Sequence, residues 1–240
     1  MNQKNNTRAL TMILVPFALL ACSKQAELTN QELLCKAYLD CVEATNEKIR
    51  PLVCLTNDDK NVIWNENNDR VLMFTFHRYP DSYPDNQEVT FSWGESWVCS
   101  VKEYTNWYKN NKDNIKDVLL RTKQVLGMDE TSLNTYITSM WFDPSDLERP
   151  AYVTDVTKQM SLQFEETVTD EYKEWFEGQY YYSYETKHLP WTRLGYTYDW
   201  SKDAKDRYGL SEFIAWNGTT VTVDKTMLVN DFVEYISTNY

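Results

Sequence analysis

The sequence predicts an α+β fold for residues 29–240, in which a mainly antiparallel sheet is flanked by helices. Short runs rich in β-branched and aromatic residues, such as 70–77 and 135–142, indicate strands. Apolar residues at helical spacing, such as those of 30–44 and 111–126, indicate amphipathic helices. The sequence contains no internal repeat, low-complexity tract or long linker. A single α+β domain therefore accounts for this part of the chain.

Capping and turn signals place the first elements. Thr29 and Glu32 form a capping box ahead of the first helix. The β-rich runs 89–93 and 96–101, which surround Gly94-Glu95, are typical of a hairpin. We therefore expect these two runs to pair with each other.

The same signals continue through the second half of the chain. Gly127 is expected to end the helix that begins at residue 111. Asn217-Gly218 predicts a second hairpin, formed by the runs 210–216 and 219–224. The other expected elements are helices over 100–108, 169–178 and 227–236, and a short helical turn after Asp143.

The cysteines predict two disulfides near the N-terminus. Besides Cys22, the chain has Cys35, Cys41, Cys54 and Cys99, and an even number of cysteines is typical of proteins that form disulfides outside the cytoplasm. Cys35 and Cys41 lie roughly 120° apart around a helix, so each is expected to pair with Cys54 or Cys99 instead. The alternative is a metal site, but the spacings are not of the C-x2-C type.

The N-terminus has the layout of a secretory signal peptide. Lys4 and Arg8 precede a short apolar run over 12–20, which is shorter than the roughly 20 residues that span a bilayer. Residues 19–22, Leu-Leu-Ala-Cys, resemble the lipobox of bacterial lipoproteins. This resemblance implies cleavage before Cys22 and lipidation of that residue. The alternative is an ordinary signal peptide that ends near an unrelated cysteine.

This layout divides the chain into a signal peptide (1–21), a tether (22–28) and the α+β domain (29–240). The residue after Cys22 is Ser23 and not aspartate, and in this the chain resembles lipoproteins sorted to the outer membrane of Gram-negative cells. We expect the domain to face the periplasm there. In a Gram-positive cell the same anchor would hold it on the outer face of the plasma membrane.

The charge balance excludes nucleic acid as a partner. Removal of residues 1–21 leaves 22 basic and 36 acidic side chains, a net charge of −14. Such a surface repels phosphate backbones and anionic lipid headgroups. Contact with a membrane is therefore expected through the lipid anchor alone.

The sequence contains no familiar catalytic or cofactor motif. It lacks G-x-G-x-x-G, the P-loop, G-x-S-x-G and H-E-x-x-H, so we expect no cofactor and no metal site. The two histidines, His77 and His188, are too few to form a zinc site by themselves. His77 ends a strand and is expected to be structural, whereas His188 adjoins a dense aromatic stretch.

That aromatic stretch contains a candidate ligand-binding or catalytic cluster. Aromatic walls exclude water, which strengthens ionic interactions and shifts pKa values. An arginine beside two carboxylates suits an anionic or sugar-like ligand, and a carboxyl with a raised pKa suits a general acid. The alternative is a buried network that only stabilises the fold. The cluster comprises Arg193, Asp199 and Glu212, together with His188, Trp191 and Tyr198.

Two segments carry closely spaced motif residues. The first contains Arg121, Gln124, Leu126 and Gly127, followed by Met140-Trp141, Pro144, Leu147 and Arg149-Pro150; the second contains 190–200 and 209–213. Over roughly residues 90–224 the chain resembles an uncharacterised family of bacterial proteins, many of them exported or lipidated. The resemblance implies a single-domain fold and no particular activity.

Residues 212–219 (Glu-Phe-Ile-Ala-Trp-Asn-Gly-Thr) are similar to the catalytic-glutamate strand and following turn of ADP-ribosyltransferases. This resemblance implies that Glu212 is a catalytic acid. The family's second Glu or Gln, two residues earlier, is Leu210 here, and no Ser-Thr-Ser strand precedes it.

The sequence therefore predicts a lipid-anchored envelope protein that acts as a binding or interaction module, with an envelope protein or a glycan as partner. The alternative is an envelope enzyme that acts on a glycan or nucleotide-sugar-like substrate through Arg193, Asp199 and Glu212. A third possibility is a purely structural or immunity-type protein with an exposed apolar patch and no pocket.

Overall fold

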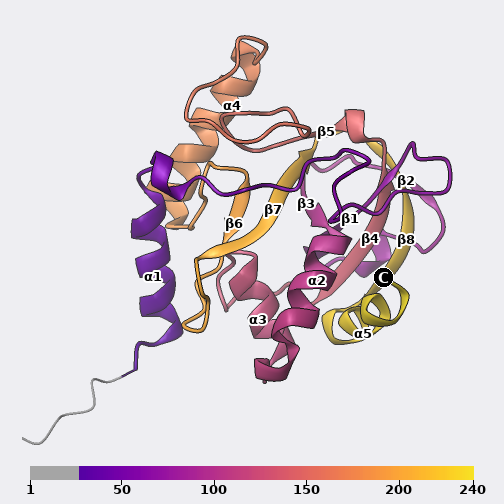
Figure 1. Cartoon of the computed structure of the whole chain (residues 1–240), viewed down its shortest axis with the longest axis horizontal. Helices are drawn as coiled ribbons and strands as arrows, with labels where there is room; N and C mark the ends of the chain where they lie inside the picture. The colour runs from indigo at the N-terminus through magenta and orange to yellow at the C-terminus, as the bar shows by residue number, and fades with distance from the viewer. Residues whose placement is uncertain (1–26) are drawn as a thin grey trace, which may run out of the picture.

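The computed structural model describes residues 27–240, which form a single α+β domain (Figure 1). An eight-stranded antiparallel sheet runs in the order β2-β8-β4-β1-β3-β7-β5, with β6 paired to β7. The predicted signal peptide, the lipobox and Cys22 lie outside the described residues. Within 27–240, no helix is both long enough and apolar enough to cross a membrane.

Most elements lie close to the bounds that the sequence predicts, but β5 and β6 were not predicted as strands and β8 extends beyond its predicted end. The strands are β1 (Val71–His77), β2 (Glu88–Thr90), β3 (Ser96–Ser100), β4 (Tyr136–Phe142), β5 (Leu147–Glu148), β6 (Tyr196–Tyr198), β7 (Tyr208–Ala215) and β8 (Thr220–Leu228). The α-helices are α1 (Asn30–Cys41), α2 (Val101–Asn111), α3 (Val118–Val125), α4 (Asp170–Tyr181) and α5 (Val229–Asn239).

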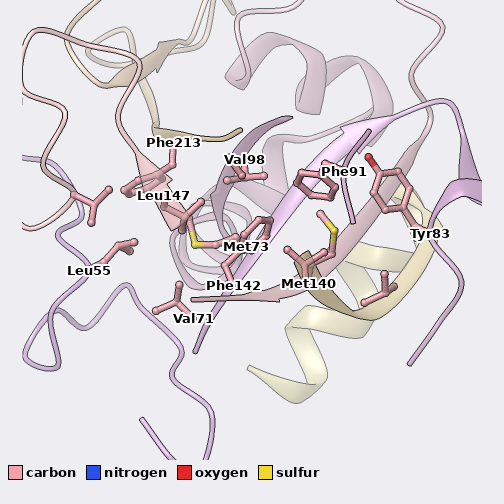
Figure 2. Close-up of a cluster of buried hydrophobic side chains, with 14 residues drawn as sticks. Leu55, Val71, Met73, Tyr83, Phe91, Val98, Met140, Phe142, Leu147 and Phe213 are labelled. Carbon is pink, nitrogen blue, oxygen red and sulfur yellow. The ribbon is translucent and has the colours of Figure 1, made fainter. Parts of the chain in front are cut away.

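The sheet curves around one apolar core on its first face. Met73, Val98, Met140, Phe213 and Val223 come from five different strands and belong to one buried cluster. Figure 2 shows this cluster, with Leu55 at one end and Tyr83 at the other. Because side chains alternate between faces along a strand, the neighbouring residues of β1 point to the opposite face.

Helices α2, α3 and α5 cover that opposite face and lie together in Figure 1. Leu72, Phe74 and Ile137 of the sheet belong to one buried cluster with residues of these helices, and the Phe74 ring contacts Tyr104 of α2 and Phe232 of α5. Burial of each such side chain contributes roughly 1.5–3 kcal/mol to folding. Helices α1 and α4 form a third core beside β7, together with the aromatic segment that precedes β7.

The predicted starts of α1, α2 and α4 are confirmed, and a side chain caps each of these helices. The Thr29 hydroxyl accepts a hydrogen bond from the Glu32 backbone at 3.2 Å, and the Glu32 carboxylate accepts one from the Thr29 backbone at 2.8 Å. The helix predicted over 111–126 is shorter than expected. It begins at Val118 because Asp117 caps it, accepting from the backbone N–H of Leu120 at 2.9 Å.

Both predicted hairpins are wrong. Strand β2 pairs with β8, whereas β3 pairs with β1 and β7. Strands β7 and β8 are joined by the Asn217-Gly218 turn, yet they are not neighbours in the sheet. The reason is that Phe91 enters between them: its carbonyl accepts from Gly218 N at 2.8 Å, and its N–H donates to the Thr219 carbonyl at 2.9 Å.

The predicted disulfides are also wrong, because Cys35, Cys41, Cys54 and Cys99 are free thiols. Cys41 is buried in the core that α1 and α4 form, and Cys99 is buried on the helix-covered face of the central sheet. Cys35 is exposed on α1. Cys54 lies in a loop, where the Gln159 side-chain amide donates to its sulfur at 3.1 Å. The four thiols thus belong to separate environments.

Candidate functional site

The central sheet opens between β1 and β3. These strands pair only at Met73 with Ser100 and at Phe74 with Cys99. Beyond that point β1 stays paired with β4 as far as His77, and β3 stays paired with β7. The two halves of the sheet therefore separate, and a cavity of about 590 Å³ occupies the gap. We call it the strand-gap cavity.

Adjacent strands supply one side of this cavity. Phe74, Cys99 and Glu212 form a row across β1, β3 and β7, because Cys99 is the register partner of both other residues. Trp97 lies two residues before Cys99 and therefore on the same face. Its register partner is Ile214, so Trp97 and Glu212 are diagonal neighbours, typically about 7 Å apart at Cβ.

Glu212 places an unpaired carboxyl group at the cavity. Its side chain is partly exposed, lines the cavity and makes no hydrogen bond with another residue of the described chain. Burial raises the pKa of this carboxyl from 4.5 to about 8. At neutral pH, Glu212 is therefore mostly a neutral acid that can donate a hydrogen bond.

The segments after α3 and before β6 form the facing wall. Gly127 ends α3 with a φ of +67°, and a side chain there would contact the Tyr198 backbone at 3.4 Å. Trp191 lines the cavity and is 7% exposed, and its indole Nε1 has no hydrogen-bond partner within the described residues. The Trp191 and Trp97 rings meet nearly at right angles, with centroids 6.2 Å apart.

The Tyr198 side chain also lines the cavity, and its hydroxyl donates to the Asp40 carboxylate of α1 at 2.9 Å. Burial, with that hydrogen bond, raises the pKa of the Tyr198 phenol. The hydrogen bond to Asp40 thus holds the Tyr198 ring in place at the cavity and connects this wall to α1.

His77 lines the cavity as a neutral, structural residue. Its Nδ1 accepts from the Tyr79 backbone at 3.1 Å, so its proton is on Nε2, which contacts the Thr138 hydroxyl at 2.7 Å. That hydroxyl donates to Thr226, which donates to the Tyr83 carbonyl. Both ring nitrogens are thus used, and burial lowers the His77 pKa to about 4.

The candidate cluster is not assembled at this cavity. Glu212, Trp191 and Tyr198 line it, whereas Arg193, Asp199 and His188 do not. His188 is exposed and packs against Tyr38, with ring centroids 4.8 Å apart.

Arg193 instead holds the C-terminal end of α1. Its guanidinium donates to the Val42 carbonyl at 2.7 Å, to the Cys41 carbonyl at 3.3 Å and to two tyrosine hydroxyls. The residue is 7% exposed. The last carbonyls of a helix lack intrahelical partners, so a buried guanidinium stabilises them.

Asp199 forms a buried ion pair with Arg121. Its two carboxylate oxygens accept from the guanidinium at 3.0 and 2.5 Å, and Asp199 is 2% exposed. Burial raises the Asp199 pKa, which Arg121 opposes. The Trp200 backbone also donates to the Gln124 carbonyl. The two motif segments that carry the family resemblance therefore contact each other through α3.

The aromatic residues that β1 and β3 contribute were not among the predicted site residues. Phe74, Phe76 and Trp97 read as ordinary strand residues, and their alternation places them on one face. No sequence signal shows that β1 and β3 separate, because the gap depends on which strands become neighbours. Within residues 27–240, no group of three or more His, Cys, Asp or Glu side chains is arranged to hold a metal ion.

Comparisons with protein-family models, with curated proteins and with solved structures gave no match to this chain.

Proposed function

We propose that this protein is a lipid-anchored envelope protein whose domain binds a small molecule in the strand-gap cavity. The lipobox-like segment supports the anchor, and Ser23 supports an outer-membrane location with the domain facing the periplasm. The observation that carries the binding role is the aromatic cavity at the centre of the sheet.

The size and lining of the cavity favour a small molecule. Its volume of about 590 Å³ falls within the range of roughly 300–1,000 Å³ that is typical of ligand sites. Ten of the lining residues are aromatic, and polar groups at the cavity, such as Glu212 and the Trp191 indole N–H, can orient a ligand. An interaction protein without a pocket is therefore the weaker hypothesis.

A rim substitution tests this proposal. Ser132 lies at the cavity and is partly exposed, so Ser132→Trp is expected to place a ring in it. Leu133→Trp is the matched control, because Leu133 is 68% exposed and does not line the cavity. A small-molecule library is screened against the purified mature protein by tryptophan fluorescence and thermal shift. Hits that bind the wild type and Leu133→Trp but not Ser132→Trp support the proposal, and equal binding to all three contradicts it.

Mass spectrometry of the native protein tests the anchor separately. We expect an N-terminal Cys22 that carries acyl chains. An unmodified Cys22, or an N-terminus at another residue, would overturn the anchor and leave the cavity proposal standing.

The enzyme alternative depends on Glu212. A neutral carboxylic acid in a cavity can act as a general acid, which favours this hypothesis. Arg193 and Asp199 are occupied elsewhere, and no Lys or Arg of the described chain lines the cavity, so a nucleotide-sugar diphosphate has no cation there. Full complementation of a deletion strain by Glu212→Gln would rule out a catalytic Glu212.

A further inference from the structure

Acidic residues line the strand-gap cavity, and none of its lining residues is Lys or Arg. Of the 28 residues that line it, three are acidic, namely Glu95, Asp129 and Glu212. His77, the one histidine among them, is neutral because both of its ring nitrogens are held in hydrogen bonds. The described lining therefore offers carboxyl groups and no cationic side chain to a ligand.

The aromatic residues complement that charge. Ten of the 28 lining residues are Phe, Tyr or Trp. Trp97 and Trp191 form a corner, with ring planes at 82°, and Trp97 is the diagonal neighbour of Glu212. The faces of aromatic rings attract cations, by about 2 kcal/mol or more where water is excluded. An aromatic corner beside a carboxyl group is thus suited to an ammonium group.

Resting on the proposed small-molecule function, we infer that the ligand of the strand-gap cavity is an organic cation: an amine or quaternary ammonium group on a largely apolar body. The ammonium group binds between the Trp97–Trp191 corner and Glu212, and the apolar body contacts the remaining aromatic walls. The unpartnered indole N–H of the buried Trp191 also provides a donor for an oxygen acceptor on the same ligand.

Binding of the cation displaces a proton from Glu212. Cys99, opposite on β3, stays a neutral thiol because burial raises its pKa well above the ordinary value. Glu103 of α2 is held by Tyr208 and Ser211. Glu212, with a pKa of about 8, is the group that ionises when an ammonium ion arrives near neutral pH.

Three probes of one shape test the charge preference. They are 4-phenylbutylamine, 4-phenylbutanol and 4-phenylbutyrate, which are cationic, neutral and anionic near pH 7. Titration calorimetry with the mature protein is expected to rank the amine first and the carboxylate last, with at least about a tenfold difference in Kd between them. The enthalpy of amine binding should depend on the buffer, because a proton is released.

Substitutions separate this inference from the proposed function. Glu212→Gln should weaken amine binding at least about tenfold and abolish proton release, while alcohol binding changes less than about twofold. Glu95→Gln, at a partly exposed side chain without a hydrogen bond in the described chain, should weaken the amine about two- to threefold. Glu234→Gln on α5 is the control, exposed and away from the cavity, and should have no effect.

The outcomes are distinct. Equal binding of the three probes, preference for the carboxylate, or unchanged amine affinity in both Glu212→Gln and Glu95→Gln would overturn the cation inference while the small-molecule function stands. Failure of all three probes, together with no Ser132→Trp-sensitive hit in the library screen, would overturn both. Circular dichroism of each variant establishes that it is folded.

Discussion

Substitution of Glu212 by glutamine should change how the stability of the domain depends on pH. In the folded protein the Glu212 pKa is about 8, whereas an exposed glutamate has a pKa near 4.5. Between these values the folded state keeps the proton and the unfolded state has lost it. The free energy of unfolding therefore falls as the pH rises from about 4.5 to 8. Glutamine does not titrate, so the variant lacks this loss.

The magnitude follows from the pKa shift. Each pKa unit corresponds to about 1.4 kcal/mol, so the full shift corresponds to about 5 kcal/mol above pH 8. Glu212 is partly exposed to the cavity, where water screens the charge. We therefore expect Glu212→Gln to exceed the wild type by about 2–3 kcal/mol at pH 9 and to match it near pH 4.5.

Urea unfolding, followed by tryptophan fluorescence from pH 4.5 to 9, measures this difference. Glu103, whose pKa burial raises to about 7, titrates in the same window, but it is present in both proteins and largely cancels in the comparison. Glu234→Gln provides the control for loss of an exposed charge. Parallel stability profiles for wild type and Glu212→Gln would refute the view that Glu212 is neutral in the folded protein.

Four further predictions concern the fold. The pKa of His77 is about 4 in the folded protein and 6.5 when the imidazole is exposed, so the free energy of unfolding should fall by about 3 kcal/mol as the pH drops from 6.5 to 4. His77→Gln should remove most of this loss in urea unfolding. An unchanged pH dependence in the variant would contradict the assignment. Asp199→Ala leaves Arg121 unpaired and should cost about 3–5 kcal/mol by the same measurement, with part of the loss recovered in the double variant with Arg121→Met. Gly209→Ala would place a Cβ 2.2 Å from the Val125 carbonyl and should lower Tm in calorimetry by the equivalent of about 2–3 kcal/mol, whereas Gly178→Ala, where nothing lies within 4 Å, should not lower it. Among the described cysteines, a thiol reagent should modify exposed Cys35 rapidly and buried Cys41 and Cys99 only on unfolding; modification of all of them at one rate would argue against this burial.

The parts of the fold that depend on neighbouring residues were predictable. The capping box at Thr29 and Glu32, the strand 71–77 and the final helix all rest on interactions within a few residues. The helix 118–125 shows the limit of this approach, because the periodicity of 111–126 continues through a break that Asp117 creates. Because Asp117 lies inside the periodic pattern of 111–126, the pattern alone does not show that the helix begins after it.

The parts that depend on distant residues were not predictable. Asn217-Gly218 does form a turn, with Gly218 at a φ of +94°, but the Phe91 backbone takes the hydrogen bonds that would have closed a hairpin. Likewise, the cysteine count agrees with two disulfides, yet the fold distributes the thiols among separate environments. Turn type and cysteine number are local properties, whereas pairing depends on the topology of the whole sheet.

The charged residues considered for the site differ in whether other residues of the protein form hydrogen bonds or ion pairs with their side chains. Arg193 donates to helix-end carbonyls, and Asp199 accepts from Arg121, so each has its partners inside the protein. Glu103 is buried with a raised pKa, yet Tyr208 and Ser211 donate to its carboxylate. Glu212 has no such donor and lines the cavity. A fold gains nothing from an unpaired carboxyl beside an open cavity, and its cost in stability is offset when a ligand supplies the opposite charge. Glu212 is therefore the residue of this cluster that we assign to binding.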